Sequence, residues 1–177
     1  ESFNNILTVN PDLYDRTIVL NGVSKAYSMT GWRIGYAAGP QPLIGAMKKI
    51  QSQSTSNPTS IAQVAAQAAL EGDHGCVKDM VKVFKQRHDY MVKALNEIDG
   101  IECLAGDGTF YVFPDFSGMQ AKMGCETDTD LAEKLLEAGV ALVPGSAFGT
   151  PGHMRISFAT SDENLQKAVE RLKAASL

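Results

Sequence analysis

The sequence has 177 residues, of which 44% are hydrophobic and 20% are charged. This composition is ordinary for a globular α/β protein of one domain or slightly more, so a disordered chain is not expected. The formal net charge of −4 argues against a surface that binds nucleic acid or an anionic membrane, although it permits a local basic pocket for a phosphate. No stretch approaches the roughly 18 apolar residues of a membrane span.

Two short strands and three helices are predicted in the first half, in chain order. The β-branched run 17–21 is typical of a buried strand, and a second strand over 34–38 ends at Gly39 and Pro40. Helices are expected over 42–53 and over 60–72, with Ser60 as the cap of the second. A long helix over 75–98 follows. Its apolar stripe, at spacings of three and four, consists of Val77, Val81, Phe84, His88, Met91, Leu95 and Ile98.

The second half alternates strands and helices and is expected to close a small core of its own. We predict strands over 101–105, 108–116, 140–145 and 153–159, and helices over 128–139 and 162–175, the last capped by Ser161. In the first half, by contrast, the apolar faces need a partner sheet. We therefore predict a division into residues 1–85 and 86–177.

The three cysteines, Cys76, Cys103 and Cys125, are far apart and show neither metal-ligand nor redox spacing. We predict reduced thiols, no metal site and a cytoplasmic location. The amino-terminal residues lack the charged lead and the apolar run of a signal peptide. Because the chain does not begin with Met, we expect its first residue to mark a cut.

One segment, SKAYSMTGWRIGY at residues 24–36, combines residue types that suit a phosphorylated aldehyde. Lys25 follows a predicted strand and a glycine turn, at a strand end where α/β sheets place ligands. Its amine can form a Schiff base with an aldehyde, and the planar fork of Arg33 suits phosphate oxygens. Taken alone, the two residues are better explained as a surface lysine and a surface arginine near a turn. His88 is expected to be a partly buried helix residue, and His74 and His153 to lie in loops without partners.

The whole string resembles the cofactor-lysine segment of the class I/II (fold-type I) pyridoxal-phosphate-dependent aminotransferases, in the prokaryotic-type aspartate aminotransferase branch. The agreement continues through SNPTSIAQ, GTFYVFP, VALVPGSAFG and MRISFATSDENL, in the order and spacing of the family. The resemblance implies an α/β chain that corresponds to the carboxy-terminal part of that fold. Residues 1–85 would be the remnant of the large domain, and residues 86–177 the small domain.

The resemblance also implies roles for individual residues. Lys25 matches the lysine that holds pyridoxal 5′-phosphate and later moves the substrate proton. Arg33 matches the arginine that grips the cofactor phosphate, and Ser24 would add a hydroxyl there. Arg155 matches the arginine that binds the α-carboxylate of the substrate. The implied substrates are an amino acid, aspartate by resemblance, and a 2-oxo acid, and the implied assembly is a homodimer.

The family's earlier half supplies further cofactor contacts, including the Asp on the ring nitrogen, that have no counterpart in this sequence. We therefore expect the 177-residue chain alone to have little or no transaminase activity. Two alternatives stay open: another enzyme of the same fold, such as an aromatic or alanine aminotransferase or a carbon–sulfur lyase, and a non-catalytic module. A nucleotide-binding protein is disfavoured, because neither GxGxxG nor GxxxxGK[ST] occurs.

Overall fold

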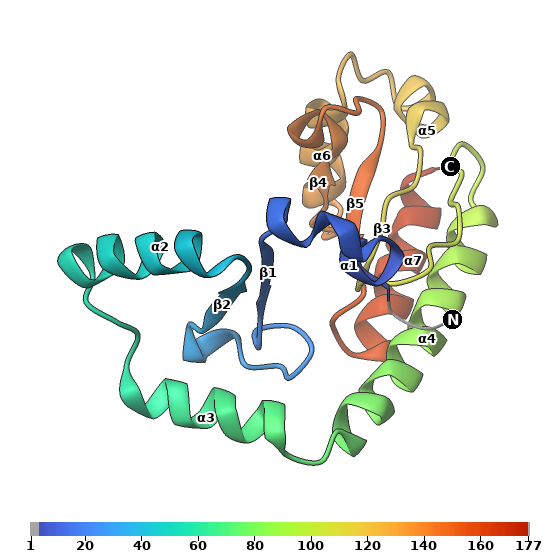
Figure 1. Ribbon diagram of the computed structural model, residues 1–177. Coiled ribbons are helices and arrows are strands. Elements are labelled where there is room, and N and C mark those ends of the chain that lie inside the picture. Colours follow the sequence, from blue (N-terminus) through green and yellow to red (C-terminus); the bar gives the residue numbers. More distant parts are fainter. Residues whose placement is uncertain (1–3, 177) are drawn as a thin grey trace. The chain divides into compact units, whose positions relative to one another are not determined.

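The computed structural model describes residues 4–176, which form two compact units (Figure 1). The first unit ends at Lys78 and the second begins at Asp79. This division falls within the long helix α4 (Gly75–Asn96). The sequence places a domain boundary slightly later in the same helix, after residue 85, and that boundary stays a prediction. None of the helices in the described part of the chain is both long and apolar enough to cross a membrane.

The first unit consists of a two-stranded antiparallel sheet with short and long helices around it. Its elements are α1 (Ile6–Val9), η1 (Pro11–Arg16), β1 (Val19–Gly22), η2 (Thr30–Trp32), β2 (Gly35–Ala38), α2 (Gln41–Ser54) and α3 (Ser60–Glu71). Strands β1 and β2 pair from Val19↔Ala38 to Gly22↔Gly35. The predicted strands and the two longer helices are confirmed, whereas α1 and η1 were not predicted. Both short helices start at an asparagine side chain, Asn5 for α1 and Asn10 for η1.

The core of the first unit is small. Val23, Ile34, Ala62 and Ala66 are buried together, and Tyr27 packs against them. The prediction that the first strand is buried is wrong for this chain, because Leu20 is 74% exposed. A two-stranded sheet has too few strands to bury both faces, so apolar side chains stay uncovered. These include Leu20, Ile50, Ile61 and Val64.

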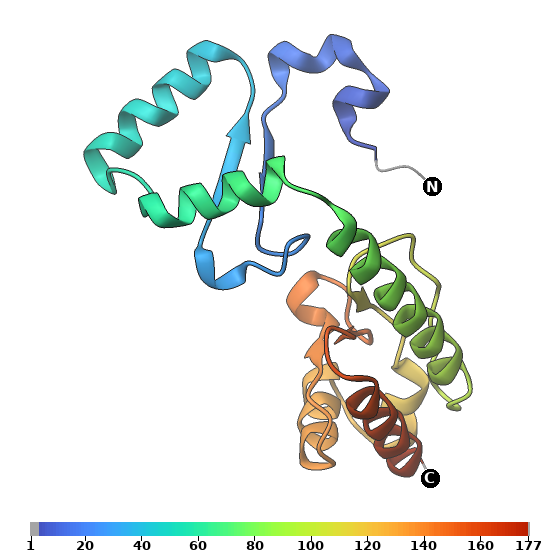
Figure 2. The same ribbon diagram turned by 90° about the horizontal axis from the view of Figure 1, so that it is seen from below.

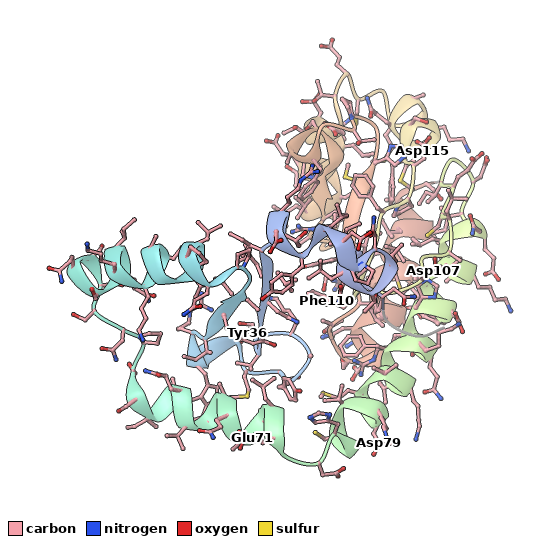
Figure 3. All side chains as sticks on the ribbon, in the orientation of Figure 1. Tyr36, Glu71, Asp79, Asp107, Phe110 and Asp115 are labelled. Atoms are coloured by element: carbon pink, nitrogen blue, oxygen red, sulfur yellow. The ribbon has the colours of Figure 1, made fainter. Side chains whose placement is uncertain are left out.

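Helix α3 begins one residue earlier than its predicted cap requires. Thr59 occupies the cap position and Ser60 is the first helical residue, with no side-chain capping bond, so the prediction that Ser60 is the cap is wrong. Between α3 and β2 lies a groove whose lining includes Tyr36 and Glu71 (Figure 3).

The second unit packs helices against a three-stranded antiparallel sheet of order β3-β5-β4. After α4 its elements are β3 (Tyr111–Val112), α5 (Ser117–Lys122), α6 (Asp128–Glu137), β4 (Val143–Pro144), η3 (Gly145–Phe148), β5 (Met154–Ser157) and α7 (Asp162–Ala175). Helices α4 and α7 run side by side in both views (Figures 1 and 2). Ion pairs Arg87–Asp162 and Glu97–Lys173 link them at successive levels, so the two helices run in the same direction.

A continuous apolar core holds the second unit together. It is contributed by α4, the sheet and all three later helices: Met91, Ala94, Leu95, Ile98, Ile101, Cys103, Val112, Phe116, Met119, Leu131, Ala132, Leu135, Val140, Met154, Ile156, Phe158, Leu165, Val169 and Leu172. The predicted stripe on α4 is buried at its carboxy-terminal end, but Val81 is 60% exposed, so the stripe is wrong at that position. The predicted cap of α7 is confirmed, because Ser161 Oγ accepts a hydrogen bond from Asn164 N at 3.2 Å.

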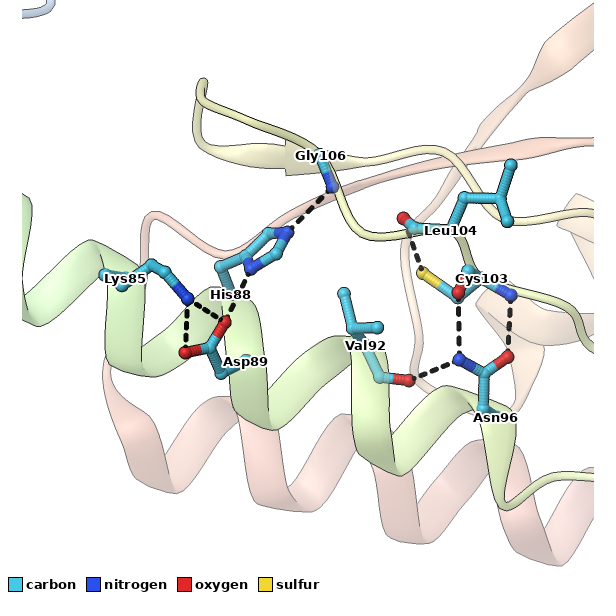
Figure 4. Close-up of polar contacts among 8 residues, drawn as sticks. All are labelled: Lys85, His88, Asp89, Val92, Asn96, Cys103, Leu104 and Gly106. Carbon is cyan, nitrogen blue, oxygen red and sulfur yellow. Dashed lines mark hydrogen bonds and ion pairs between the residues drawn. The ribbon is translucent and has the colours of Figure 1, made fainter. Parts of the chain in front are cut away.

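Two polar side chains of α4 fasten the segment that follows it (Figure 4). The amide of Asn96 accepts from Cys103 N at 2.8 Å and donates to Cys103 O at 2.8 Å, so it satisfies both backbone groups of that residue. His88 is buried, and its Nε2 accepts from Gly106 N at 3.0 Å. Because Nε2 is the acceptor, the ring proton lies on Nδ1, which is 2.9 Å from Asp89 Oδ1. His88 is therefore a packing residue, as predicted.

Replacing Asn96 by Ala is expected to lower the stability of the second unit by about 1 to 2 kcal/mol, because the buried Cys103 loses both backbone partners. The measurement is hydrogen exchange of core amides, such as that of Leu95, in the variant and the parent chain. Asn164→Ala is the matched control, because that asparagine is exposed and its side-chain amide donates to the Thr160 hydroxyl rather than to a buried backbone group. Equal protection in Asn96→Ala and Asn164→Ala would show that the Cys103 bonds contribute nothing.

Candidate functional site

The predicted cofactor residues lie on one loop that joins β1 to β2. Its two ends are fixed, because Gly22 pairs with Gly35 and the flanking residues Val23 and Ile34 are buried. A Cβ on Gly22 would lie 3.0 Å from Ile34 O, tighter than most real Cβ contacts, so a larger residue here would require the backbone of Ile34 to shift slightly. The loop therefore leaves and re-enters the sheet at a single narrow point.

Lys25 lies in a turn just after β1, as predicted. Its carbonyl accepts a hydrogen bond from Ser28 N at 3.1 Å, and Ser28 adopts a left-handed conformation with φ of 54°. Ser24 is half-buried and Lys25 is exposed in this chain. The backbone of the turn is thus fixed by its own hydrogen bond, while the lysine side chain projects from it.

Arg33 closes the loop in an unusual backbone conformation. It follows η2 with φ of 54° and ψ of 45°, a left-handed geometry that costs a residue with a Cβ about 1 to 2 kcal/mol. Its Nη1 donates to Thr30 O at 2.8 Å, so the guanidinium folds back over the loop that carries Lys25. Strain of this kind persists only where the surrounding structure enforces it, and it is concentrated at functional sites.

The loop is also tied to the segment that follows α3. Tyr27 Oη lies 3.4 Å from His74 Nε2, and the two rings meet edge to face at 5.9 Å. The same nitrogen lies 3.2 Å from Leu70 O. The prediction that His74 has no partner is therefore wrong, because the fold brings this loop histidine against the tyrosine.

The donor set of the loop fits a phosphorylated aldehyde. Ser24 supplies a hydroxyl, Lys25 an amine and Arg33 a guanidinium, all within one short segment whose ends are fixed. An amine condenses with an aldehyde, and a guanidinium donates two parallel hydrogen bonds to phosphate oxygens. No group of three or more His, Cys, Asp or Glu side chains among residues 4–176 is arranged to hold a metal ion.

Arg155 lies in the second unit, on the central strand β5, between two aromatic rings. Its Cζ is 4.7 Å from the centre of the Tyr111 ring and 4.7 Å from that of the Phe148 ring. Cation–π contacts of this kind attract the guanidinium to the ring faces and restrain its position. Within residues 4–176 no carboxylate forms an ion pair with Arg155, so a carboxylate of a ligand suits it.

Both aromatic contacts follow from the sheet and the turn beside it. Tyr111 pairs with Ser157, and Arg155 lies two residues earlier on the same face of β5, so the two side chains are diagonal neighbours. Neither Tyr111 nor Phe148 was selected from the sequence as a site residue. The register of β3 and β5 would be enough to place Tyr111 beside Arg155, but no local pattern around Phe148 indicates that its ring reaches Arg155.

His153 directly precedes β5 and contacts a further ring. Its imidazole lies 5.2 Å from the Phe113 ring, which in turn meets Phe148 edge to face at 6.0 Å. The prediction that His153 has no partner is wrong in this respect. Its Nδ1 is buried and has no hydrogen-bond partner among the described residues.

Comparison with known proteins gives consistent results. Residues 1–172 match the family model described as aminotransferase class I and II. The aspartate/prephenate aminotransferase of Nitrosomonas europaea is 54% identical over 179 residues, which cover 97% of this chain and 45% of that protein. The crystal structure of the aspartate aminotransferase from Rhizobium meliloti superposes with a TM-score of 0.92 at 47% identity, and covers 98% of this chain and 45% of that one.

A solved structure named for a different activity also matches. The aromatic aminotransferase from Pyrococcus horikoshii superposes with a TM-score of 0.82 at 39% identity, and covers 91% of this chain and 43% of that structure. The chain thus spans less than half the length of the relatives it matches.

Arg33→Gly is expected to be about 1 kcal/mol more stable than Arg33→Ala, because only glycine adopts the left-handed conformation without cost. Both variants lose the same side-chain contacts, so their difference isolates the backbone. The chain's single tryptophan, Trp32, precedes this position and reports unfolding of the first unit by fluorescence in urea. If the alanine variant unfolds at the same or a higher urea concentration than the glycine variant, the left-handed geometry is wrong.

Proposed function

Because the chain belongs to the class I and II aminotransferase family, we propose that it carries the cofactor lysine of an enzyme that transfers an amino group between aspartate and a 2-oxo acid. The predicted family and α/β fold are confirmed by the family match and by the superposition on solved aspartate aminotransferases. The activity of the whole protein, its cofactor and its substrates belong to the proposal.

One observation supports the cofactor assignment most strongly: the loop that carries Ser24, Lys25 and Arg33 is closed at both ends and strained at the arginine. Arg33 would hold the phosphate of pyridoxal 5′-phosphate through two parallel N–H donors, and the Ser24 hydroxyl would donate a further hydrogen bond. The Lys25 amine would bond the aldehyde carbon. When bound, the cofactor supplies an electron-withdrawing ring that makes the Cα–H of an amino acid acidic.

Lys25 would also be the base of the reaction. Its amine would take the proton from the Cα of the substrate amino acid. The short turn closed by Ser28 limits the movement of the lysine backbone, so the same amine serves both steps.

Arg155 would bind the α-carboxylate of the amino acid and later that of the 2-oxo acid. Tyr111 and Phe148 restrain the position of its guanidinium, which would limit the reorganisation needed when the substrate binds. A bidentate contact of this kind orients the substrate but does not distinguish one amino acid from another, because every amino acid has the same α-carboxylate.

Aspartate as the amino donor is supported by the names of two relatives, an aspartate/prephenate aminotransferase and an aspartate aminotransferase, which are 54% and 50% identical to this chain in sequence. An aromatic substrate is the alternative, supported by the Pyrococcus horikoshii structure. We further propose a homodimeric, cytoplasmic enzyme. The segment SNPTS resembles an interfacial segment of the family, and the odd number and wide spacing of the cysteines suit a reducing compartment.

The experiment is a chimera in which residues 1–172 replace the matched segment of the Nitrosomonas europaea relative. We expect the purified chimera to absorb visible light from bound cofactor and to transfer the amino group of aspartate to 2-oxoglutarate. Lys25→Ala should abolish the absorbance and lower the turnover at least about 100-fold, since a positioned general base contributes that much or more.

Lys49→Ala is the matched control, because that lysine is exposed on α2 of the same unit. Undiminished turnover and an unchanged spectrum in Lys25→Ala would overturn the assignment. Release of a thiol and ammonia from a cysteine conjugate, without amino transfer, would instead favour a carbon–sulfur lyase.

A further inference from the structure

The turn η3 carries Phe148, one of the two rings that hold Arg155, and it is fastened to helix α6 by a buried acid. Asp128 is the first residue of α6 and is only 3% exposed. Its Oδ2 accepts a hydrogen bond from Ser146 N, the second residue of η3, at 2.7 Å. Among residues 4–176 no cation forms an ion pair with this carboxylate.

A buried carboxylate without a cation needs other stabilisation, and the start of a helix supplies part of it. The remaining interaction that the structure shows is the backbone N–H of η3. Asp128 therefore serves two elements at once: it lies at the positive end of α6 and accepts from the turn that follows β4. The second role does not depend on a local sequence pattern, since Asp128 and Ser146 are separated by a whole helix and a strand.

The other ties of η3 leave the turn little freedom. Gly145 N donates to His153 O at 2.7 Å, and Thr150 N donates to Gly145 O at 3.0 Å. A Cβ on Gly145 would lie 2.2 Å from Thr150 O, so the backbone packs against itself at this point. These bonds fasten the start of the turn to β5, while the bond to Asp128 fastens it to α6.

Phe148 itself is not held by burial, because 48% of its surface is exposed. In the described chain its ring meets the Phe113 ring edge to face, and the guanidinium of Arg155 lies over its face. The position of the Phe148 ring is therefore set mainly by the backbone of η3. A shift of that turn would move the ring away from the guanidinium.

We propose that Asp128 is a positioning residue for the substrate-binding arginine: through Ser146 N it fixes η3, and through the Phe148 ring it restrains the position of the Arg155 guanidinium. The inference rests on the proposed function, because it assigns a purpose to a guanidinium that we propose binds the α-carboxylate. Asp128 touches neither substrate nor cofactor in this account.

The first test uses the 177-residue chain itself and nuclear magnetic resonance. Two flanking rings displace the side-chain proton resonances of Arg155 upfield, and Arg155→Lys identifies those resonances. We expect Asp128→Ala to lose most of the displacement, whereas Asp128→Asn keeps it because its amide oxygen accepts the same bond. Glu133→Ala, which removes an exposed acid from the same helix, should change nothing.

If Asp128→Ala does not fold, Asp128→Leu replaces it, since leucine fills the buried space without an acceptor. An unchanged displacement in the folded Ala or Leu variant overturns the proposal. So does its loss in folded Asp128→Asn, because the hydrogen bond would then not be the cause.

The second test uses the chimera and separates binding from chemistry. Asp128→Ala should raise the KM for aspartate about 10- to 100-fold with kcat little changed, as misplacement of a positioning group does, and Asp128→Asn should restore it. An equal loss in kcat with unchanged KM overturns the positioning role. An unchanged KM in Arg155→Lys overturns the proposed function of Arg155 itself, and the resonance data then judge the Asp128 contact separately.

Discussion

The pairing of Gly22 with Gly35 is the constraint on which the site of the first unit depends. Because the two glycine backbones approach closely, the chain between them forms a loop with a narrow neck, and the buried side chains of Val23 and Ile34 hold that neck in place. The amine, the hydroxyl and the guanidinium therefore belong to one short loop, which limits how far each can move relative to the others. The left-handed Arg33 shows that this closure costs backbone strain.

The second unit solves a similar problem with side chains. Arg155 is placed on the central strand, so its backbone is rigid, but a long side chain needs further restraint. The two rings supply it, one from the neighbouring strand and one from η3. The acid at the start of α6 is therefore linked to the guanidinium by a backbone hydrogen bond and a ring contact, although it does not touch it.

Local patterns were sufficient to predict the longer helices α2, α3, α4, α6 and α7, but not the short helices α1, η1 and α5 or the lengths of the strands. Ser161 and the acidic residues after it mark the start of α7, and the structure agrees. The strand expected over 101–105 is reduced to a bridge between Glu102 and Asp115, because the Asn96 amide takes both backbone groups of Cys103. The strand expected over 108–116 is limited to Tyr111–Val112, since Thr109 is left-handed with φ of 68°.

The same distinction applies to the site. Sequence strings that resemble one family were sufficient to select Ser24, Lys25 and Arg33 from residues 24–36, and Arg155 from the string MRISFATSDENL. Phe148 and Asp128 could not be selected in this way, because their roles arise only when β5, η3 and α6 come together. The exposed Leu20 is a different case: its strand has the pattern of a buried one, and the chain described here does not cover it.

The central claim is that the Lys25 amine bonds the cofactor, and chemical trapping tests it most directly. The chimera would be incubated with pyridoxal 5′-phosphate, reduced with borohydride, digested and mapped by mass spectrometry. Our account predicts that a single peptide, the one containing Lys25, gains the pyridoxyl group, and that Arg33→Ala lowers its yield at limiting cofactor. A label on another lysine, or one spread evenly over many lysines, would contradict the account.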